Sequence, residues 1–145
     1  MRRILVGGGD GTLNCAIKPL LGQDVTLGVL PLGTGNDFAR SLGIEPTLEA
    51  ACDVIAAGYT ARVDVGLANG RPFLNVAGAG FDAHVGAAFH AHGRRGGRRG
   101  VFTYVRLGFV DSWTYVAQRW VLAAGEQSFD GRALVIAFVN GRQYG

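Results

Sequence analysis

The sequence predicts a layered α/β fold with a parallel sheet, followed by a β-rich part. Two apolar runs, residues 4–6 and 25–30, are each followed by a glycine loop and then by a helix-like segment. Strands that alternate with helices in this way form parallel sheets. After Tyr59 the pattern changes to alternating polar and apolar residues with turn signals between them, which is typical of antiparallel strands.

The composition is that of a folded chain. Its 145 residues are enough for one ordinary domain or two small ones. Hydrophobic residues make up 48% and charged residues 17%, which excludes intrinsic disorder, and no apolar run reaches membrane-spanning length. The first apolar run is too short for a signal peptide, and Cys15 and Cys52 form no CxxC pair. These features predict a cytoplasmic protein with reduced thiols.

The first half of the chain repeats one pattern. Residues 4–6 predict a strand, residues 7–11 a tight loop, and residues 12–21 a helix. Pro19 is expected to end or kink that helix, because proline donates no backbone N–H. The second copy consists of a strand at 25–30, a loop at 31–35 and a short helix at 36–42.

A third helix is predicted between Thr47 and Gly58. The Thr47 hydroxyl can cap the first turn, and Gly58 is the type of residue that ends a helix. The side chains that this helix is expected to bury are Leu48, Ala51, Cys52 and Ile55.

The change of pattern predicts a domain boundary near residues 59–62. Residues 1–61 would form a partial α/β domain, and residues 62–145 a partial β-rich, sandwich-like domain with a helical insertion. Asn69-Gly70 predicts a hairpin turn that pairs residues 62–68 with 73–77. The other expected elements are a hairpin of 119–124 with 133–139, turned at 128–131, and helices at 83–91 and 101–117.

The first glycine loop has a residue set that suits a polyphosphate. Gly8, Gly9 and Gly11 leave room for a phosphate at the backbone, and Thr12 can cap the next helix or reach that phosphate. Asp10 would repel phosphates unless a divalent cation lies between them, so it indicates a metal–nucleotide site. The alternative is a tight strand-to-helix turn in which Asp10 and Thr12 serve only as caps.

The second glycine loop contains Gly33, Thr34 and Gly35. Open α/β sheets bind ligands at the carboxyl ends of neighbouring strands, so two such loops predict a shared crevice. The chain has no GxxxxGK[ST] sequence, which argues against a P-loop, and no clean GxGxxG, which argues against a plain dinucleotide fold. A nucleotide-binding α/β domain is therefore the favoured interpretation.

Two long motifs resemble those of a known family. The run from Gly8 to Asn14 (GGDGTLN) and the run from Pro31 to Arg40 (PLGTGNDFAR) resemble the catalytic domain of diacylglycerol and sphingosine kinases, especially the bacterial lipid kinases. Phe73-Leu74-Asn75, with the GFDA sequence that follows at 80–83, resembles the start of that family's second, β-rich domain.

The resemblance implies ATP-dependent phosphorylation of a diacylglycerol-like lipid hydroxyl, with Mg²⁺ as cofactor and a role in phospholipid biosynthesis. It places Asp10 in the metal and phosphate network as the catalytic residue, and it places the general base beyond Gly145. The residues that it implies in ATP binding are Gly8, Gly9, Asp10, Gly11, Thr12, Asn14, Gly33, Thr34, Gly35 and Asn36.

The chain departs from the family pattern at both ends. Family members usually have a strand, a helix and a strand before the first glycine loop, and an Asp-Gly-Glu segment near the C-terminus. We therefore expect a fragment truncated at both ends. Its strand at residues 4–6 would have an unpaired edge, which invites either aggregation or pairing with another chain, as in a homodimer. Two alternatives stay open: an inactive remnant or regulatory nucleotide-binding module, and, less favoured, a kinase acting on NAD.

Several other polar residues have a structural and a functional interpretation. Asp64, Asn75 and Asp82 either line a cleft between domains or make strand-end and turn hydrogen bonds. Asp37 and Arg40 are expected to form a local cap and ion pair.

The basic residues are concentrated in one segment. The net charge is +3, and residues 90–99 hold much of the excess. The four arginines at 94–99 favour a solvated connection; the second interpretation is contact with anionic lipids, which would place the protein peripherally at the inner membrane surface. No nucleic-acid partner is expected, because the basic residues do not spread along a face. The histidines lack partners at metal-ligand spacing.

Overall fold

The computed structural model describes residues 2–81, 83–87 and 115–141. These residues divide into two compact units, which are described separately. The first comprises residues 2–77 and 139–141, and the second comprises the described residues from 78 to 138. The predicted domain ranges, 1–61 and 62–145, do not coincide with these units and stay a prediction.

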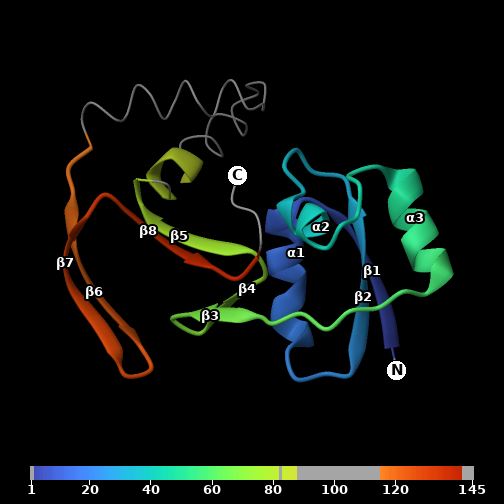
Figure 1. Ribbon diagram of the computed structural model, residues 1–145, viewed down its shortest axis with the longest axis horizontal. Coiled ribbons are helices and arrows are strands. Elements are labelled where there is room, and N and C mark those ends of the chain that lie inside the picture. The colour runs from blue at the N-terminus through green and yellow to red at the C-terminus, as the bar shows by residue number, and fades with distance from the viewer. Residues whose placement is uncertain (1, 82, 88–114, 142–145) are drawn as a thin grey trace. The chain divides into compact units, whose positions relative to one another are not determined.

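A pair of parallel strands forms the framework of the first unit. β1 (Arg2–Gly8) and β2 (Val25–Pro31) run side by side with Ile4 opposite Leu27 and Gly8 opposite Pro31 (Figure 1). The predicted parallel pairing is confirmed. Both strands extend further than their apolar runs, and they end together at the two glycine loops.

Three helices follow these strands. α1 (Asp10–Ile17) begins two residues earlier than predicted and ends before Pro19, which lies in a 3₁₀ turn (Lys18–Leu20). α2 spans Asp37–Ser41 and lies within the short helix predicted at residues 36–42. α3 spans Leu48–Ala57; the Thr47 hydroxyl accepts a hydrogen bond from the Ala50 N–H at 3.3 Å, and Gly58 ends the helix with a φ of 73°.

The burial predicted for α3 was partly wrong. Ala51 is buried and Ile55 is half-buried, but Leu48 and Cys52 are exposed. The helix contacts the strands along a narrow stripe centred on a small residue, so the neighbouring apolar side chains stay at the surface.

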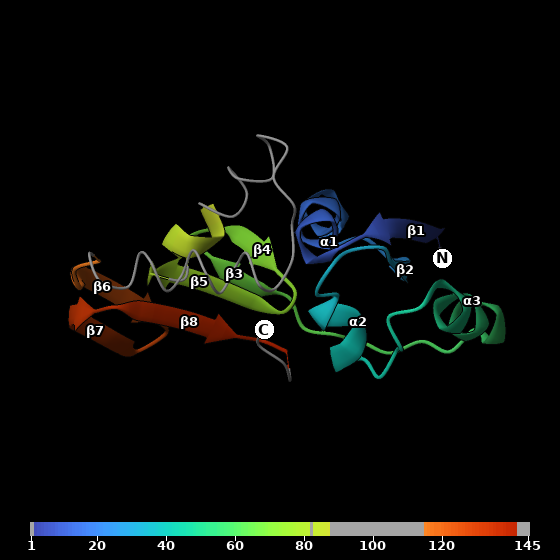
Figure 2. The same ribbon diagram turned by 90° about the horizontal axis from the view of Figure 1, so that it is seen from above.

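α1 and α3 cover opposite faces of the β1–β2 pair, as Figure 2 shows. Successive side chains of a strand point to opposite faces. Leu27 and Val29 belong to the same core as Leu13 of α1. A Cβ at Gly28, between them, would instead meet the Ile55 side chain of α3. The strands are therefore held between two helices.

The core of the first unit lies beside the glycine loops, because two of its members belong to the helices that follow those loops. Leu13 lies in α1 and Phe38 in α2, and both are buried. The buried residues of this core are Leu13, Ile17, Val29, Phe38, Ala39 and Leu74. The same packing that stabilises the unit therefore fixes the helices at the ends of the strands.

The turn at Asn69-Gly70 was predicted correctly, but its strands are shorter and differently placed. Asn69 and Gly70 have φ values of 49° and 72°, the left-handed pair that a type I′ hairpin turn requires. The turn joins β3 (Gly66–Ala68) to β4 (Arg71–Phe73). Of the residues predicted as the partner strand, Phe73 ends β4, whereas Val76 and Ala77 begin β5 (Val76–Gly80), which pairs with β8 (Val135–Val139).

The second predicted hairpin had the wrong turn. β6 (Gln118–Ala124) pairs antiparallel with β7 (Gln127–Ala133), and Gly125, with a φ of 59°, lies in the connection. Asp130 lies within β7 and accepts two hydrogen bonds from Arg119, each 2.8 Å long. This diagonal cross-strand pair favours the observed register over a turn at Asp130-Gly131.

The Arg119 guanidinium lowers the pKa of the Asp130 carboxyl. The associated stabilisation is present above the ordinary aspartate pKa of about 3.9 and is lost as the pH falls through the lower folded value. It is small, because both side chains are exposed to solvent.

The described strands form four two-stranded sheets, β1–β2, β3–β4, β5–β8 and β6–β7. The mixed α/β class is confirmed in this coarser form, and the sandwich-like arrangement of the second part stays a prediction. Residues 83–87 are helical as predicted, whereas residues 115–117, at the end of the other predicted helix, are not. Asp82, His90, His92, the arginines at 94–99, Trp113 and most of the 101–117 segment lie outside the described residues.

Among the residues that the structure describes, none of the helices has the length and apolar character needed to cross a bilayer.

Candidate active site

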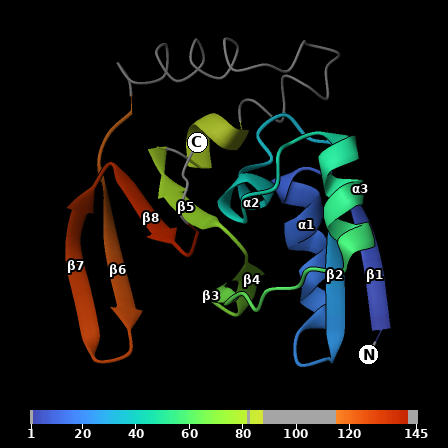
Figure 3. The ribbon, with the colours of Figure 1, turned by 45° about the vertical axis from the view of Figure 1, so that its right-hand side comes forward.

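The two glycine loops lie against each other, backbone to backbone. They follow the carboxyl ends of β1 and β2 (Figure 3). The Leu32 N–H donates to the Gly8 carbonyl at 3.2 Å. A Cβ added at Gly33 would collide with the Cα of Gly9, and one at Gly9 would lie 3.1 Å from the Cα of Gly33. Position 33 therefore requires glycine, and a side chain at position 9 would make an unusually tight contact. The two loops lie together as predicted, and the crevice between them stays a prediction.

Asp10 connects the first loop to the helix that follows the second. Its Oδ1 accepts a hydrogen bond from the Phe38 N–H at 2.9 Å, and its Oδ2 accepts one from the Asp37 N–H at 3.2 Å. These N–H groups belong to the first turn of α2, which has no intrahelical acceptor for them. The sequence indicated either a metal-directed carboxylate or a cap of the adjacent turn. The structure shows a cap, and it is on the other loop's helix.

Asn36 holds the second loop together. The residue is 5% exposed to solvent, and its backbone adopts the left-handed conformation with a φ of 53°. Its Oδ1 accepts from the Gly33 N–H and its Nδ2 donates to the Gly33 carbonyl, both at 2.8 Å. A further bond from Nδ2 to the Pro31 carbonyl measures 3.4 Å. These bonds direct the polar atoms of Asn36 into its own loop.

Asn14 has a similar structural contact. Its Oδ1 accepts from the Leu74 N–H at 3.0 Å, which ties α1 to the segment after β4. Asn140, which the sequence analysis missed, donates from Nδ2 to the carbonyls of Leu74 and Asp64, each at 2.8 Å. The Asn75 carbonyl accepts from the backbone N–H of Asn140 at 2.7 Å. The backbone carbonyls of Asp64 and Asn75 therefore accept hydrogen bonds from Asn140, the residue that follows β8.

The surface of the two loops is formed by backbone and by short side chains. Gly11, Thr12, Thr34 and Gly35 are exposed. The Thr12 side chain lies over Gly8, where an added Cβ would meet it at 2.6 Å. The Thr12 N–H donates to the carbonyl of Gly9, the N-cap residue of α1, at 3.0 Å. The N–H groups of Asp10 and Gly11 precede it and have no intrahelical acceptor. Backbone N–H groups and hydroxyls are suitable donors for an anion.

Arg40 does not form the expected ion pair with Asp37. Its Nε donates to the Gly35 carbonyl at 3.1 Å instead. A Cβ added at Gly35 would be 3.5 Å from both Asp37 Oδ1 and Asp10 Oδ2, so both carboxylates lie near this glycine. The Arg40 side chain therefore holds the second loop through the Gly35 carbonyl.

The described residues do not fit a magnesium centre built by the protein alone. They contain no group of three or more histidine, cysteine, aspartate or glutamate side chains at metal-binding distance. Both Asp10 oxygens already accept backbone N–H bonds. Mg²⁺ in such enzymes is held by one or two carboxylates together with substrate phosphates. The carboxylates beside the loops are those of Asp10 and Asp37, which both lie near Gly35, so a magnesium site completed by bound ATP stays a prediction.

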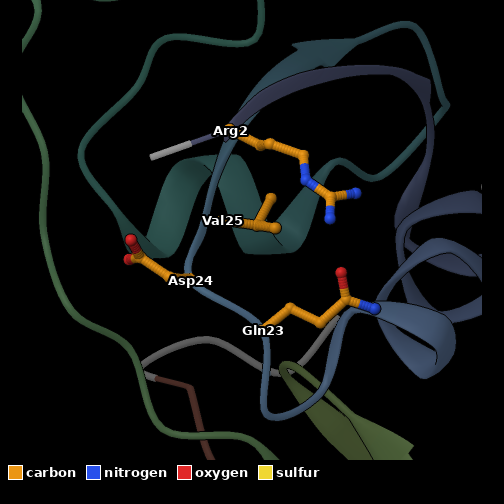
Figure 4. Close-up of a pocket in the computed structure, with 4 residues that line it drawn as sticks. All are labelled: Arg2, Gln23, Asp24 and Val25. Atoms are coloured by element: carbon orange, nitrogen blue, oxygen red, sulfur yellow. The ribbon is translucent and has the colours of Figure 1, made fainter.

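A surface depression elsewhere on the first unit is not part of this site. Arg2, Gln23, Asp24 and Val25 line it (Figure 4). It lies at the amino ends of β1 and β2, whereas the glycine loops lie at their carboxyl ends. Ligands of open α/β sheets bind at the carboxyl ends, so this depression is not the expected substrate site.

Comparison with known proteins agrees with the arrangement of the loops. Residues 1–68 match the diacylglycerol kinase catalytic domain, and this range contains both glycine loops. Through these residues the chain belongs to the diacylglycerol kinase catalytic-domain family. The family resemblance inferred from the two motifs is therefore confirmed.

The similarity to members of this kinase family extends over the whole chain. The proteins named "Probable lipid kinase YegS" from Shigella flexneri and from Escherichia coli O1:K1 / APEC are each 34% identical over 147 residues, 98% of this chain and 48% of theirs. A crystal structure of a diacylglycerol kinase from Bacillus anthracis str. Sterne is 30% identical, with a TM-score of 0.67 over 97% of this chain and 45% of that one. The chain spans about half the length of the curated relatives it matches.

Membership in a diacylglycerol kinase family implies the use of ATP. The structure places all ten residues that were expected to bind it in the first unit, on or next to the two loops. Direct contact with ATP stays a prediction for each of them. Asp10, Asn14 and Asn36 differ from the others, because their polar side-chain atoms already bond within the protein.

Proposed function

We propose that this chain carries the ATP-binding loops of a lipid kinase, which transfers the γ-phosphate of ATP to a diacylglycerol-like hydroxyl. The observation that carries the proposal is the backbone contact between Gly9 and Gly33, which places two anion-compatible loops at one end of a parallel strand pair. The 34% identity to bacterial proteins named as probable lipid kinases supports the choice of a lipid acceptor.

The loops would contribute by positioning and by electrostatic stabilisation. In phosphoryl transfer the bond between the γ-phosphorus and the β–γ bridging oxygen breaks, a bond to the lipid hydroxyl oxygen forms, and ADP leaves. Fixed N–H donors of α1 and hydroxyls such as those of Thr12 and Thr34 would hold the phosphates without reorganising. A bound Mg²⁺ would neutralise phosphate charge. The hydroxyl proton would require a base to accept it.

A lipid acceptor would require the protein to act at a membrane surface. Anionic headgroups attract clustered arginines by about 1 kcal/mol each, which is the proposed role of the arginines at 94–99. Pairing of β1 with a second copy of the chain is also a proposal; among the described strands, β1 pairs with β2 alone.

A nucleotide-binding module without transferase activity is the second candidate. It is favoured by the two backbone hydrogen bonds that the Asp10 carboxylate accepts, because these bonds hold this carboxylate against α2. Both candidates require ATP to bind at the two loops. Only the lipid kinase also transfers the γ-phosphate to a lipid.

Transfer of label from [γ-³²P]ATP to diacylglycerol in mixed micelles tests the proposed function. Labelled phosphatidate that forms with Mg²⁺ and disappears in Gly33→Ala would support a lipid kinase. Retained ATP binding without labelled lipid would support the non-catalytic module. Incorporation that is the same with and without added lipid would exclude a lipid acceptor.

A further inference from the structure

The cap on α2 comes from a residue 27 positions earlier in the chain. α2 has five residues, and its own N-cap residue, Asn36, makes no capping bond because its side chain turns back to Gly33. The first two N–H groups of α2 would therefore lack partners. Asp10 supplies an acceptor to each of them, at 3.2 Å for Asp37 and 2.9 Å for Phe38.

This contact suits a carboxylate in particular. Two separate N–H donors require two acceptor atoms, and a carboxylate offers both in a fixed geometry. Its negative charge also lies at the positive end of the helix, which strengthens the bonds. A short helix with no side-chain cap of its own depends on such a partner more than a long one does, since few internal hydrogen bonds hold it.

The site of contact connects the two loops. Asp10 is the first residue of α1 and directly follows Gly9, which touches Gly33. The two loops are therefore held together by two contacts. One is between the backbones of Gly9 and Gly33, and the other is between the Asp10 carboxylate and the first turn of α2. Together they set both the distance and the orientation of the second loop relative to the first.

We propose that Asp10 is a positioning residue, which anchors the second glycine loop through the N-terminus of α2, and that it acts on the nucleotide through that loop rather than as a ligand of the metal ion. The proposal deepens the proposed function, and it rests on that function only for the role of the loops. It replaces the catalytic role that the sequence suggested for Asp10.

Three substitutions separate the two roles. Asp10→Ala removes both acceptors. Asp10→Asn keeps one oxygen acceptor while removing the charge, so it can cap one of the two N–H groups but is a poor magnesium ligand. Asp53→Ala is the matched control, because it removes an exposed carboxylate of α3 that has no hydrogen bond or ion pair in the described part of the chain.

Amide hydrogen exchange, measured by NMR without nucleotide or metal, tests the anchor. In Asp10→Ala we expect the amides of Asp37 and Phe38 to exchange at least about tenfold faster, the size of effect expected for loss of a helix cap. Asp10→Asn should restore slow exchange at one of the two, and Asp53→Ala should leave both unchanged. Amides of β2 report whether the variant is still folded.

Unchanged exchange at both amides in folded Asp10→Ala would overturn the anchor. Should Asp10→Ala fail to fold, Asp10→Asn decides: exchange that is unchanged at both positions overturns the proposal, and faster exchange at one of them supports it. Because no nucleotide is present, these outcomes do not depend on whether the chain binds ATP.

The magnesium dependence of ATP binding tests the second half of the proposal. The Mg²⁺ concentration that gives half-maximal ATP binding should agree within about twofold between the wild type and Asp10→Asn, since neither would use Asp10 as a ligand. An increase of about tenfold or more in Asp10→Asn would show that the carboxylate binds the metal, and would overturn the proposal. Absence of ATP binding in the wild type would refute the proposed function and leave the exchange result to decide on the anchor.

Discussion

Replacing Gly33 with alanine is expected to destabilise the first unit by about 1–3 kcal/mol, the usual cost of an overpacked site, and to abolish ATP binding. The added Cβ would collide with the Cα of Gly9 and lie 2.8 Å from Asn36 Oδ1. The first neighbour is backbone and the second is the atom that accepts the Gly33 N–H, so neither can move without opening the second loop. Denaturant unfolding and ATP titration measure the two effects.

Gly11→Ala is the matched control for stability. It makes the same glycine-to-alanine change in the first glycine motif, within the first turn of α1. The added Cβ there would meet nothing within 4 Å. Its free energy of unfolding should equal or slightly exceed that of the wild type, because alanine has the higher helix propensity. Equal stabilities for Gly33→Ala and the wild type would mean that the loops are not in backbone contact.

Truncating Leu13 to alanine is expected to lower the free energy of unfolding by about 3–5 kcal/mol, in the upper part of the range for fully buried leucines. Leu13 is 1% exposed and is the largest fully buried side chain among the described residues. It packs in the core with Phe38 of α2. The cavity would therefore loosen both helices that follow the glycine loops, and the loss is a large fraction of the stability of an ordinary domain.

Leu67→Ala provides the comparison for this substitution. Leu67 lies on β3 and is 64% exposed, so the same truncation should change the free energy of unfolding by less than about 0.5 kcal/mol. Similar losses for the two variants would contradict the position of the core between α1 and the strands.

The features that the sequence predicted correctly depend on neighbouring residues. The two apolar runs with their glycine loops predicted β1, β2 and the ends at which they meet. Thr47 predicted the start of α3, and Asn69-Gly70 predicted a hairpin turn, because capping and left-handed turns are properties of two to four residues.

The features that were missed depend on contacts between distant residues. Asp10 could be recognised as unusual in a phosphate loop, but its bond to Phe38 required the two loops to be placed side by side first. Asp130-Gly131 has the composition of a turn, yet the cross-strand bond with Arg119 is formed in a register that places it inside β7. Asn140 follows an apolar strand, and the sequence alone gives no indication that it bonds with residue 64.

ATP titration of the ¹⁵N-labelled chain, followed through the amides of Gly11 and Gly35, tests most directly whether the two loops form one nucleotide site. Both residues are exposed, and each belongs to a different loop. We predict that both signals shift together with a single dissociation constant, and that AMP, which lacks the β- and γ-phosphates, shifts them much less. A shift confined to one loop, or none at saturating ATP, would contradict the shared site.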